Sequence, residues 1–306
     1  MNVLVATEKP FSKEAVEAIR TEIEKAGHTL LLLERYTDRA QLLEAASKAD
    51  AMIIRSDKIK TDVFEAAPSL KIVVRAGAGY DNVDLEAATK AGVVVENTPG
   101  QNSNAVAELV FGMAVMALRN MYDASTGREL RNRRLGIHAF GQVGRCVARI
   151  AKGFGMEVSA LDPFCPDEVM EQAGVRPVHS VEELYAGNDV VSLHIPATPE
   201  TVKSVGKELI EAMPKGALLV NTARKEVIDE EGLAKALADR TDIKYVADVA
   251  PDNAAELKEL YPGRVFFTPK KMGAQTAEAN AGAGIAAARQ IVAFFADGTR
   301  LHQVNK

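Results

Sequence analysis

The chain has 306 residues, of which 47% are hydrophobic and 26% charged, and its formal net charge is −5. These values are ordinary for a soluble globular protein that is long enough for two domain cores. The negative net charge argues against a nucleic-acid partner or an anionic membrane surface, because both would repel the chain. An anionic substrate would therefore have to be bound by a local cluster of cations.

Cysteine content and the N-terminus bear on the compartment. The two cysteines, Cys146 and Cys165, cannot form a disulfide framework, which favours a reducing cytoplasm. Residues 1–10 lack the basic start and the long apolar core of a signal peptide. No apolar run approaches the roughly 20 residues that a membrane span needs. We therefore expect a cytoplasmic protein without a membrane partner.

The first hundred residues alternate short apolar runs with amphipathic stretches, which predicts strands alternating with helices. Ser12 is a favourable N-cap and Gly27 is favourable just past a helix end, so one helix is expected between them. Further helices are expected over residues 39–47, 61–67 and 84–91. Strands are expected over residues 2–6, 29–33, 51–54, 71–74 and 93–96. This alternation predicts a parallel sheet with helices on both faces.

A second alternating series follows a long apolar helical stretch at 104–118 and a polar connection at 121–134. Strands are expected over residues 135–138, 157–161, 190–194, 218–221, 245–249 and 265–267. Helices are expected over residues 142–154, 181–186, 207–213, 230–238 and 276–296. The predicted fold class is α/β, with two doubly wound parallel-sheet domains.

A glycine turn between a strand and a helix occurs in residues 135–145, which read LGIHAFGQVGR. The stretch nearly fits the G-x-G-x-x-G fingerprint of dinucleotide sites, with Ala139 in the first glycine position. Gly141 would let the backbone approach a pyrophosphate, and Gly144 would let the helix pack closely on the strand. The N–H groups at the start of the helix would then face the phosphates.

Asp162 strengthens this interpretation, since a glycine turn alone is a weak signal. It ends the next expected strand, about 20 residues on, where a carboxylate accepts hydrogen bonds from the adenosine ribose. An aspartate there would repel a 2′-phosphate, which favours NAD over NADP. The alternative is that Asp162 is only a turn residue before Pro163.

Several further motifs are spread over the whole chain. They are RAGAGYDNVD at 75–84, NTPGQNS at 97–103, AEL at 107–109, HIPATPET at 194–201, NTAR at 221–224 and ADV at 247–249. With these motifs the chain resembles the D-isomer-specific 2-hydroxyacid dehydrogenases. It resembles a short form without a regulatory extension, in which a lysine replaces the catalytic histidine.

The resemblance implies a discontinuous domain arrangement. Residues 1–99 and 285–306 would form the substrate domain, and residues 100–284 the Rossmann domain that binds NAD, with a cleft between the two. It also implies a homodimer. The connection before Leu135 is shorter than is usual in the family.

The resemblance assigns one set of residues to the cofactor and another to the substrate. The residues expected to bind NAD are Gly141, Gln142, Val143, Gly144, Asp162, His194, Pro196, Thr222, Ala223 and Asp248. The residues expected to bind the substrate are Arg55, Ser56, Arg75, Gly77, Ala78, Gly79 and Asn102. No metal is expected.

The residues themselves support a phosphorylated substrate. Arg55 and Ser56 follow an apolar strand, and with Arg75 they could bind a phosphate by charge-assisted hydrogen bonds. The glycine-rich turn at 77–79 offers backbone N–H groups for a carboxylate. The alternatives are ordinary surface charge and a bare glycine turn.

Oxidation of a 2-hydroxy acid needs a cation for the carboxylate and a base for the hydroxyl proton. Arg224 follows an apolar strand, at the sheet edge where ligands bind, and its planar guanidinium suits a carboxylate. We therefore expect Arg224 to be catalytic. The alternative is a surface arginine that opens a loop.

The segment that should supply the base reads TPKKMGA at 268–274 and contains no histidine. Alignment of the following glycine and threonine with the family motif selects Lys271, and alignment of the preceding Thr-Pro selects Lys270. Lys271 is the preferred assignment. Asp252 is the acid that could pair with it, although such a pair would make the lysine harder to deprotonate. A solvated Lys-Lys loop and a turn at Asp252 are the alternatives.

The leading hypothesis is NAD-dependent oxidation of 3-phospho-D-glycerate to 3-phosphohydroxypyruvate, the entry to serine synthesis. A second hypothesis is another enzyme of the family, such as a glyoxylate or hydroxypyruvate reductase. A third is an NAD-sensing binding protein without turnover, which loss of the histidine would suit.

Overall fold

The computed structural model describes residues 1–305, and the chain forms two compact units. Unit 1 comprises Met1–Asn102 and the segment from Gln275 onward, and unit 2 comprises Ser103–Ala274. The sequence boundaries were expected at residues 99 and 285. In the structure all of helix α12 (Ala277–Asp297) belongs to unit 1, where its alanine-rich face shares a core with helix α1.

Unit 1 contains a five-stranded parallel sheet in the order β2-β1-β3-β4-β5. The strands are β1 (Asn2–Thr7), β2 (Thr29–Glu34), β3 (Ala51–Ile54), β4 (Ile72–Arg75) and β5 (Val94–Asn97). The helices besides α12 are α1 (Lys13–Lys25), α2 (Arg39–Ala46), α3 (Thr61–Ala66) and α4 (Leu85–Lys90). Two separate hydrophobic clusters pack in this unit, one containing α1 and α12 and the other α2 and α3. The predicted sheet with two covered faces is confirmed.

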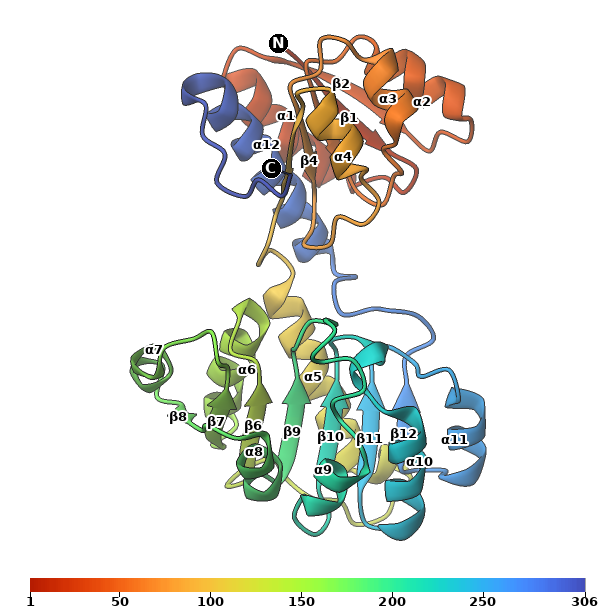
Figure 1. Ribbon diagram of the computed structural model, residues 1–306, viewed down its shortest axis with the longest axis vertical. Coiled ribbons are helices and arrows are strands. Elements are labelled where there is room, and N and C mark those ends of the chain that lie inside the picture. The colour runs from red at the N-terminus through yellow and green to blue at the C-terminus, as the bar shows by residue number, and fades with distance from the viewer. Residues whose placement is uncertain (306) are drawn as a thin grey trace. The chain divides into compact units, whose positions relative to one another are not determined.

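Unit 2 contains a seven-stranded parallel sheet in the order β12-β11-β10-β9-β6-β7-β8 (Figure 1). The strands are β6 (Arg134–His138), β7 (Glu157–Leu161), β8 (Arg176–Pro177), β9 (Val190–Leu193), β10 (Leu218–Asn221), β11 (Lys244–Ala247) and β12 (Val265–Phe267). The α-helices are α5 (Ser103–Leu118), α6 (Gln142–Gly153), α7 (Asp167–Gln172), α8 (Val181–Gly187), α9 (Lys207–Ala212), α10 (Glu230–Asp239) and α11 (Ala254–Leu260). Two 3₁₀ turns complete the unit, η1 (Asn120–Tyr122) and η2 (Lys225–Val227).

Helix termini follow the local sequence. The Ser12 side chain accepts a hydrogen bond from the N–H of Ala15, as expected of an N-cap, and Gly27 adopts a left-handed φ of 77° just past α1. The elements that sequence patterns did not predict are α7, β8, α11 and the two 3₁₀ turns. Strand β8 and the two 3₁₀ turns span only two or three residues, which is too few for a periodic signal.

Each sheet has one point where the strand order reverses. In unit 1 it lies between β1 and β3, and in unit 2 between β6 and β9. Parallel sheets of this kind bind ligands outside the carboxyl ends of the strands at such points. Arg55 directly follows β3, and the glycine turn directly follows β6. The topology therefore places both predicted binding segments at the edges where ligands bind.

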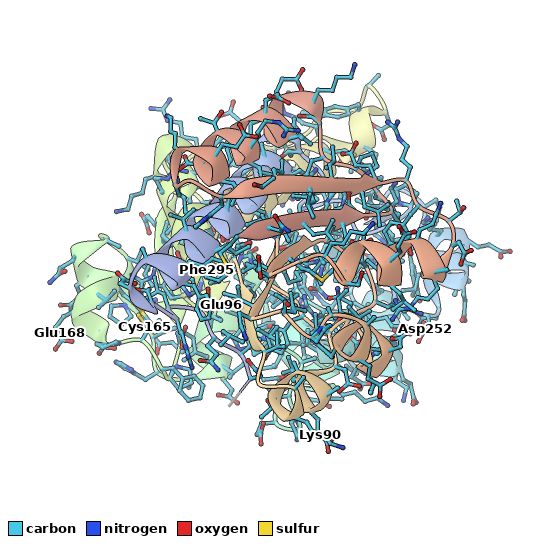
Figure 2. The ribbon with its side chains drawn as sticks, turned by 90° about the horizontal axis from the view of Figure 1, so that it is seen from above. Lys90, Glu96, Cys165, Glu168, Asp252 and Phe295 are labelled. Carbon is cyan, nitrogen blue, oxygen red and sulfur yellow. The ribbon has the colours of Figure 1, made fainter. Side chains whose placement is uncertain are left out.

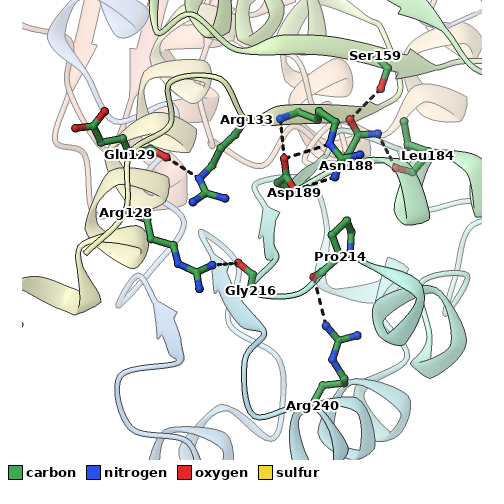
Figure 3. A network of polar contacts seen from close by, with 11 residues as sticks. Arg128, Glu129, Arg133, Ser159, Leu184, Asn188, Asp189, Pro214, Gly216 and Arg240 are labelled. Atoms are coloured by element: carbon green, nitrogen blue, oxygen red, sulfur yellow. Dashed lines mark hydrogen bonds and ion pairs between the residues drawn. The ribbon is translucent and has the colours of Figure 1, made fainter. Parts of the chain in front are cut away.

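The amino end of the unit 2 sheet carries a separate polar network (Figure 3). The Asp189 carboxylate accepts hydrogen bonds from the backbone N–H and the guanidinium of Arg134, both at 3.0 Å. Ser159 donates to Asn188 at 3.1 Å, and Asn188 donates to the carbonyl of Leu184 at 2.7 Å. These contacts tie β6, β7 and α8 together at the end of the sheet away from the glycine turn.

Helix α6 approaches β6 closely because residue 144 is a glycine. A Cβ added to Gly144 would lie 2.4 Å from the carbonyl oxygen of Ala139 and 3.1 Å from Cγ2 of Ile137. Real Cβ atoms do not approach a carbonyl oxygen so closely, so a larger residue would displace the helix. The sequence expectation that Gly144 permits close helix packing agrees with this geometry.

Replacement of Gly144 by alanine is expected to destabilise unit 2 by about 1–3 kcal/mol, the usual cost of overpacking. The measurement is the free energy of unfolding in urea. Gly153→Ala is the matched control, because Gly153 also lies in α6 and a Cβ there meets nothing within 4 Å. Equal stability of Gly144→Ala and the parent protein would contradict the packing argument.

Candidate active site

The glycine turn after β6 leaves the first turn of α6 open. Gly141 is the N-cap of α6, makes no side-chain cap, and has open space where a Cβ would stand. The first N–H groups of a helix need acceptors from outside the helix and attract anions. Ala139 adopts a left-handed φ of 84°, the conformation that the first glycine of the fingerprint normally supplies. The alanine therefore forms the expected turn at a cost of about 1–2 kcal/mol.

Asp162 links this turn to the end of β7. Its carboxylate accepts one hydrogen bond from the N–H of Phe140 at 2.8 Å and one from the N–H of Phe164 at 2.9 Å. The second bond is the turn contact that the alternative reading foresaw. The first holds the glycine turn against the strand whose end should meet the ribose. Each carboxylate oxygen can accept a further hydrogen bond, so the ribose role stays a prediction.

The end of β10 carries a polar turn that includes an orphaned hydroxyl. Thr222 directly follows β10, and its buried Oγ1 makes no hydrogen bond. The Asn221 side chain accepts from the N–H of Ala223 at 2.9 Å and donates to the carbonyl of Arg224 at 2.9 Å. Buried polar atoms are nearly always paired. An unpaired hydroxyl beside the turn therefore fits a polar group of a bound ligand, and with the open N-terminus of α6 it fits a dinucleotide.

Two histidines lie at the carboxyl ends of β6 and β9. The Ser192 hydroxyl and Nε2 of His194 are 2.9 Å apart, and Nδ1 of His138 lies 3.3 Å from the Tyr185 hydroxyl. Burial lowers the pKa of His194 to about 3, and burial lowers the pKa of His138 to about 4. Both rings are therefore neutral at pH 7 and are poor proton acceptors. They suit a structural place beside the cofactor better than the role of base.

The segment with the two lysines follows β12 and is fastened to the end of β11. Asp248 is 1% exposed, and its carboxylate accepts from the Thr268 hydroxyl at 2.9 Å, the Met272 N–H at 2.7 Å and the Gly273 N–H at 2.8 Å. The side chains of Lys270 and Lys271 are exposed on the loop between these anchors. Sequence reasoning assigned Asp248 to the cofactor and did not foresee this contact with the lysine segment.

Arg224 belongs to the same edge of the sheet. Because β10, β11 and β12 are neighbours, the turn at Thr222–Arg224, Asp248 and the lysine segment all follow adjacent carboxyl ends. The Arg224 side chain is exposed and donates to the carbonyl of Ala223 at 2.9 Å. Unit 2 thus offers a cation and a lysine segment on one edge, the two groups that the chemistry needs.

Asp252 is engaged elsewhere. Its carboxylate lies 2.5 Å from the ammonium of Lys225, and 80% of the Asp252 side chain is exposed. Figure 2 labels the position of Asp252. The N–H groups of Asp252 and Asn253 donate to Glu230 at 2.9 and 3.3 Å, which fixes the turn. The neighbouring Asn253 has a buried Oδ1 without a hydrogen-bond partner. The pairing of Asp252 with Lys271 therefore stays a prediction, and the side-chain contact that the structure gives Asp252 is with Lys225.

Arg55 lies at the switch point of the unit 1 sheet. Its guanidinium donates to the carbonyls of Lys9 and Pro10 at 2.9 and 3.2 Å and to the side chain of Asn280 at 2.5 Å. It also stacks on the Phe11 ring, 5.2 Å from the centroid. Burial lowers the pKa of Arg55. The predicted phosphate ligand therefore also ties β1, β3 and α12 together.

Arg75 directs its guanidinium over the glycine-rich turn. Its Nε donates to the carbonyl of Arg55 at 3.2 Å, and a Cβ on Gly77 would collide with Nη1. Burial lowers the pKa of Arg75. The Gly77 N–H donates to the Thr98 hydroxyl at 2.6 Å, so an anion at this turn would depend on the N–H groups of Ala78 and Gly79. Thr98 was not identified from the sequence.

The remaining predicted substrate residues are less informative. Ser56 is exposed just after Arg55, and Asn102 lies half-buried at the end of the first segment of unit 1. Within residues 1–305, no group of three or more His, Cys, Asp or Glu side chains could hold a metal ion. No helix in that part of the chain is long and apolar enough to cross a membrane.

Residues 105–269 match the D-isomer specific 2-hydroxyacid dehydrogenase family, in its NAD-binding domain. The chain belongs to this family. The match lies inside unit 2, so the open helix N-terminus and the orphaned hydroxyl belong to the family's NAD-binding domain. NAD is therefore the cofactor that unit 2 binds, as the glycine turn and Asp162 had suggested.

Relatives within the family carry more than one activity in their names. The chain is 38% identical to D-3-phosphoglycerate dehydrogenase of Methanocaldococcus jannaschii, over 83% of this chain and 51% of the relative. It is 33% identical to hydroxypyruvate reductase of Thermotoga maritima, over 90% of this chain and 93% of the relative. It thus spans about half the length of the archaeal phosphoglycerate dehydrogenases that it matches.

A solved structure within the family is similar over nearly its whole length. It is the NAD⁺-bound 3-phosphoglycerate dehydrogenase of Entamoeba histolytica, with 46% sequence identity and a TM-score of 0.85. The comparison covers 100% of this chain and 99% of the other. The two-domain α/β fold is therefore that of the family.

Proposed function

We propose that this family member is an enzyme that oxidises 3-phospho-D-glycerate to 3-phosphohydroxypyruvate with NAD. The observation that carries the proposal is the lysine segment, fastened by Asp248 on the sheet edge that also carries Arg224. An acid/base group in place of the absent histidine argues for turnover and against a protein that only senses NAD. The names of the relatives at 46% and 38% identity support the choice of substrate.

The proposed reaction requires two things of the protein, to position the substrate and to transfer one proton. Arg224 would hold the substrate carboxylate through its planar guanidinium and polarise the C2 oxygen. Lys271 would take the proton of the C2 hydroxyl, which requires its amine to be neutral at that moment. NAD, when bound, accepts the hydride from C2. In the reverse direction the ammonium of Lys271 would return the proton to the C2 oxygen.

The phosphate would be recognised by unit 1. Arg55 directly follows β3, Arg75 ends the neighbouring strand β4, and Nε of Arg75 donates to the backbone carbonyl of Arg55. Two adjacent guanidinium groups with Ser56 between them in the sequence suit a dianion rather than a neutral hydroxymethyl group. A reductase for small unphosphorylated acids would not need them. We also propose that the protein acts as a cytoplasmic homodimer, as the resemblance to the family suggests.

Asp162 is expected to set the preference for NAD over NADP, since its carboxylate would repel a 2′-phosphate. Asp162→Ala should narrow the preference, measured as the ratio of kcat/KM for the two cofactors. The variant also removes the bond to the Phe140 N–H, so both cofactors should bind somewhat less tightly. Equal or better turnover with NADP by the parent protein would refute this assignment.

Arg55→Ala is expected to lower kcat/KM for 3-phosphoglycerate about tenfold or more, the loss of one charge-assisted hydrogen bond. The variant also loses contacts inside unit 1, so D-glycerate serves as the reference substrate. Only the ratio of the two kcat/KM values reports recognition of the phosphate. An unchanged ratio would remove Arg55 from the phosphate site, and a parent enzyme that prefers D-glycerate would favour the reductase alternative.

Lys271→Ala is expected to lower kcat by about 10²–10⁴-fold while NAD still binds, because general-base catalysis contributes that much. Lys270→Ala is the matched control, with the same change one residue away on the same exposed loop. It should be much milder. The reverse result would move the base to Lys270. Near-normal kcat in both variants would mean that the proton leaves through another group.

A further inference from the structure

We infer that Asp248 is a positioning residue, which fixes the lysine segment and selects Lys271 rather than Lys270 as the acid/base group. The part of the inference that concerns catalysis rests on the proposed function. The part that concerns the contacts of Asp248 does not, because those contacts are properties of unit 2 alone.

The Asp248 carboxylate is the common acceptor of hydrogen bonds from both ends of the lysine segment. Its Oδ1 accepts from the Thr268 hydroxyl and the Met272 N–H, and its Oδ2 accepts from the Gly273 N–H. The Thr268 hydroxyl also lies 2.9 Å from the carbonyl oxygen of Asp248. A carboxylate that is 1% exposed must be compensated by such donors, so the loop and the acid are bound to each other.

The anchors lie on both sides of the lysines but not at equal distance from them. The Met272 N–H belongs to the peptide unit that begins at the carbonyl carbon of Lys271, and this unit is planar. The bond of that N–H to Asp248 therefore fixes the backbone directly at Lys271. Lys270 is one peptide unit further from this anchor and follows Pro269. The backbone of Lys271 is thus held more directly than that of Lys270.

Position 273, whose N–H donates to Asp248, leaves little space for a side chain. A Cβ at this position would lie 3.0 Å from Oδ2 of Asp248 and 3.1 Å from Cγ2 of Val106. Both distances are tighter than most Cβ contacts, so an alanine here would require its neighbours to shift by a few tenths of an ångström. We expect this shift to weaken the 2.8 Å hydrogen bond from the Gly273 N–H while leaving Asp248 intact.

Asp248→Asn tests the inference with little change of shape. An amide has one accepting oxygen and one donating nitrogen, so the bond from the Met272 N–H or the bond from the Gly273 N–H must be lost. With NAD and 3-phosphoglycerate we expect kcat to fall about tenfold or more, since small displacements of a reacting group are costly. Because Asp248 is also an expected NAD contact, the dissociation constant of NAD is measured alongside, and the fall in kcat should clearly exceed any loss of NAD affinity. Amide hydrogen exchange at Met272 and Gly273, followed without substrate, should become faster.

Asp189→Asn is the matched control. Asp189 also accepts several hydrogen bonds in unit 2, from Arg134, but it lies at the amino end of the sheet (Figure 3). This variant should lower stability without lowering kcat and without changing exchange at Met272 or Gly273. Gly273→Ala is the second test variant if Asp248→Asn fails to fold. It should reproduce the loss of kcat with NAD affinity retained.

Two results would overturn the inference. One is that Asp248→Asn lowers NAD affinity by the same factor as kcat while amide exchange at Met272 and Gly273 is unchanged. Asp248 would then be a cofactor contact only. The other is unchanged exchange and unchanged kcat. Absence of turnover in the parent protein would refute the proposed function instead, and the exchange measurement would still decide whether Asp248 fixes the loop.

Discussion

One buried carboxylate organises the reactive edge of the NAD-binding unit. Asp248 stands at the end of β11, out of contact with water, and its oxygens must be supplied with hydrogen-bond donors. The donors come from the segment after β12, which thereby takes a defined course. The position of the two lysines follows from this constraint, because they lie between its anchors. A change at Asp248 is therefore expected to move the lysine that we propose as the proton acceptor.

The parallel sheets determine what else can lie near this carboxylate. In unit 2 the order of the strands brings the ends of β10, β11 and β12 side by side, so Arg224 and the lysine segment share an edge. The same sheet reverses its order beside β6, where Gly141 leaves the start of α6 open to phosphates. Unit 1 places Arg55 at its own reversal point, and Arg75 ends the neighbouring strand β4. The proposed binding and catalytic residues thus lie at or just after the ends of strands.

The sequence predicted much of this framework for a physical reason. Fully buried parallel strands appear as apolar runs, and the longer helices show periodic apolar faces, so most elements were found within one or two residues. The short helices α7 and α11 lack that periodicity. Ala139 made the match to the glycine fingerprint weaker, yet its backbone adopts the left-handed conformation that a glycine would adopt there.

Side-chain partners were harder to foresee than elements. The contact of Asp248 with Met272 and Gly273 joins residues more than 20 positions apart through backbone N–H groups, which no residue type signals. The pairing of Asp252 with Lys225 likewise depends on how two loops meet. Asn221 could have been found, since it begins the NTAR motif and its side chain shapes that turn. The orphaned hydroxyl of Thr222 is visible only once burial is known.

A crystal structure of the protein with NAD and 3-phosphoglycerate would test the central claim most directly. The account predicts Nζ of Lys271 within hydrogen-bond reach of the C2 oxygen, about 2.6–3.2 Å, with the N–H groups of Met272 and Gly273 still on the Asp248 carboxylate. It would be contradicted by Lys270 at the C2 oxygen. It would also be contradicted by an Asp248 carboxylate that has left the lysine segment.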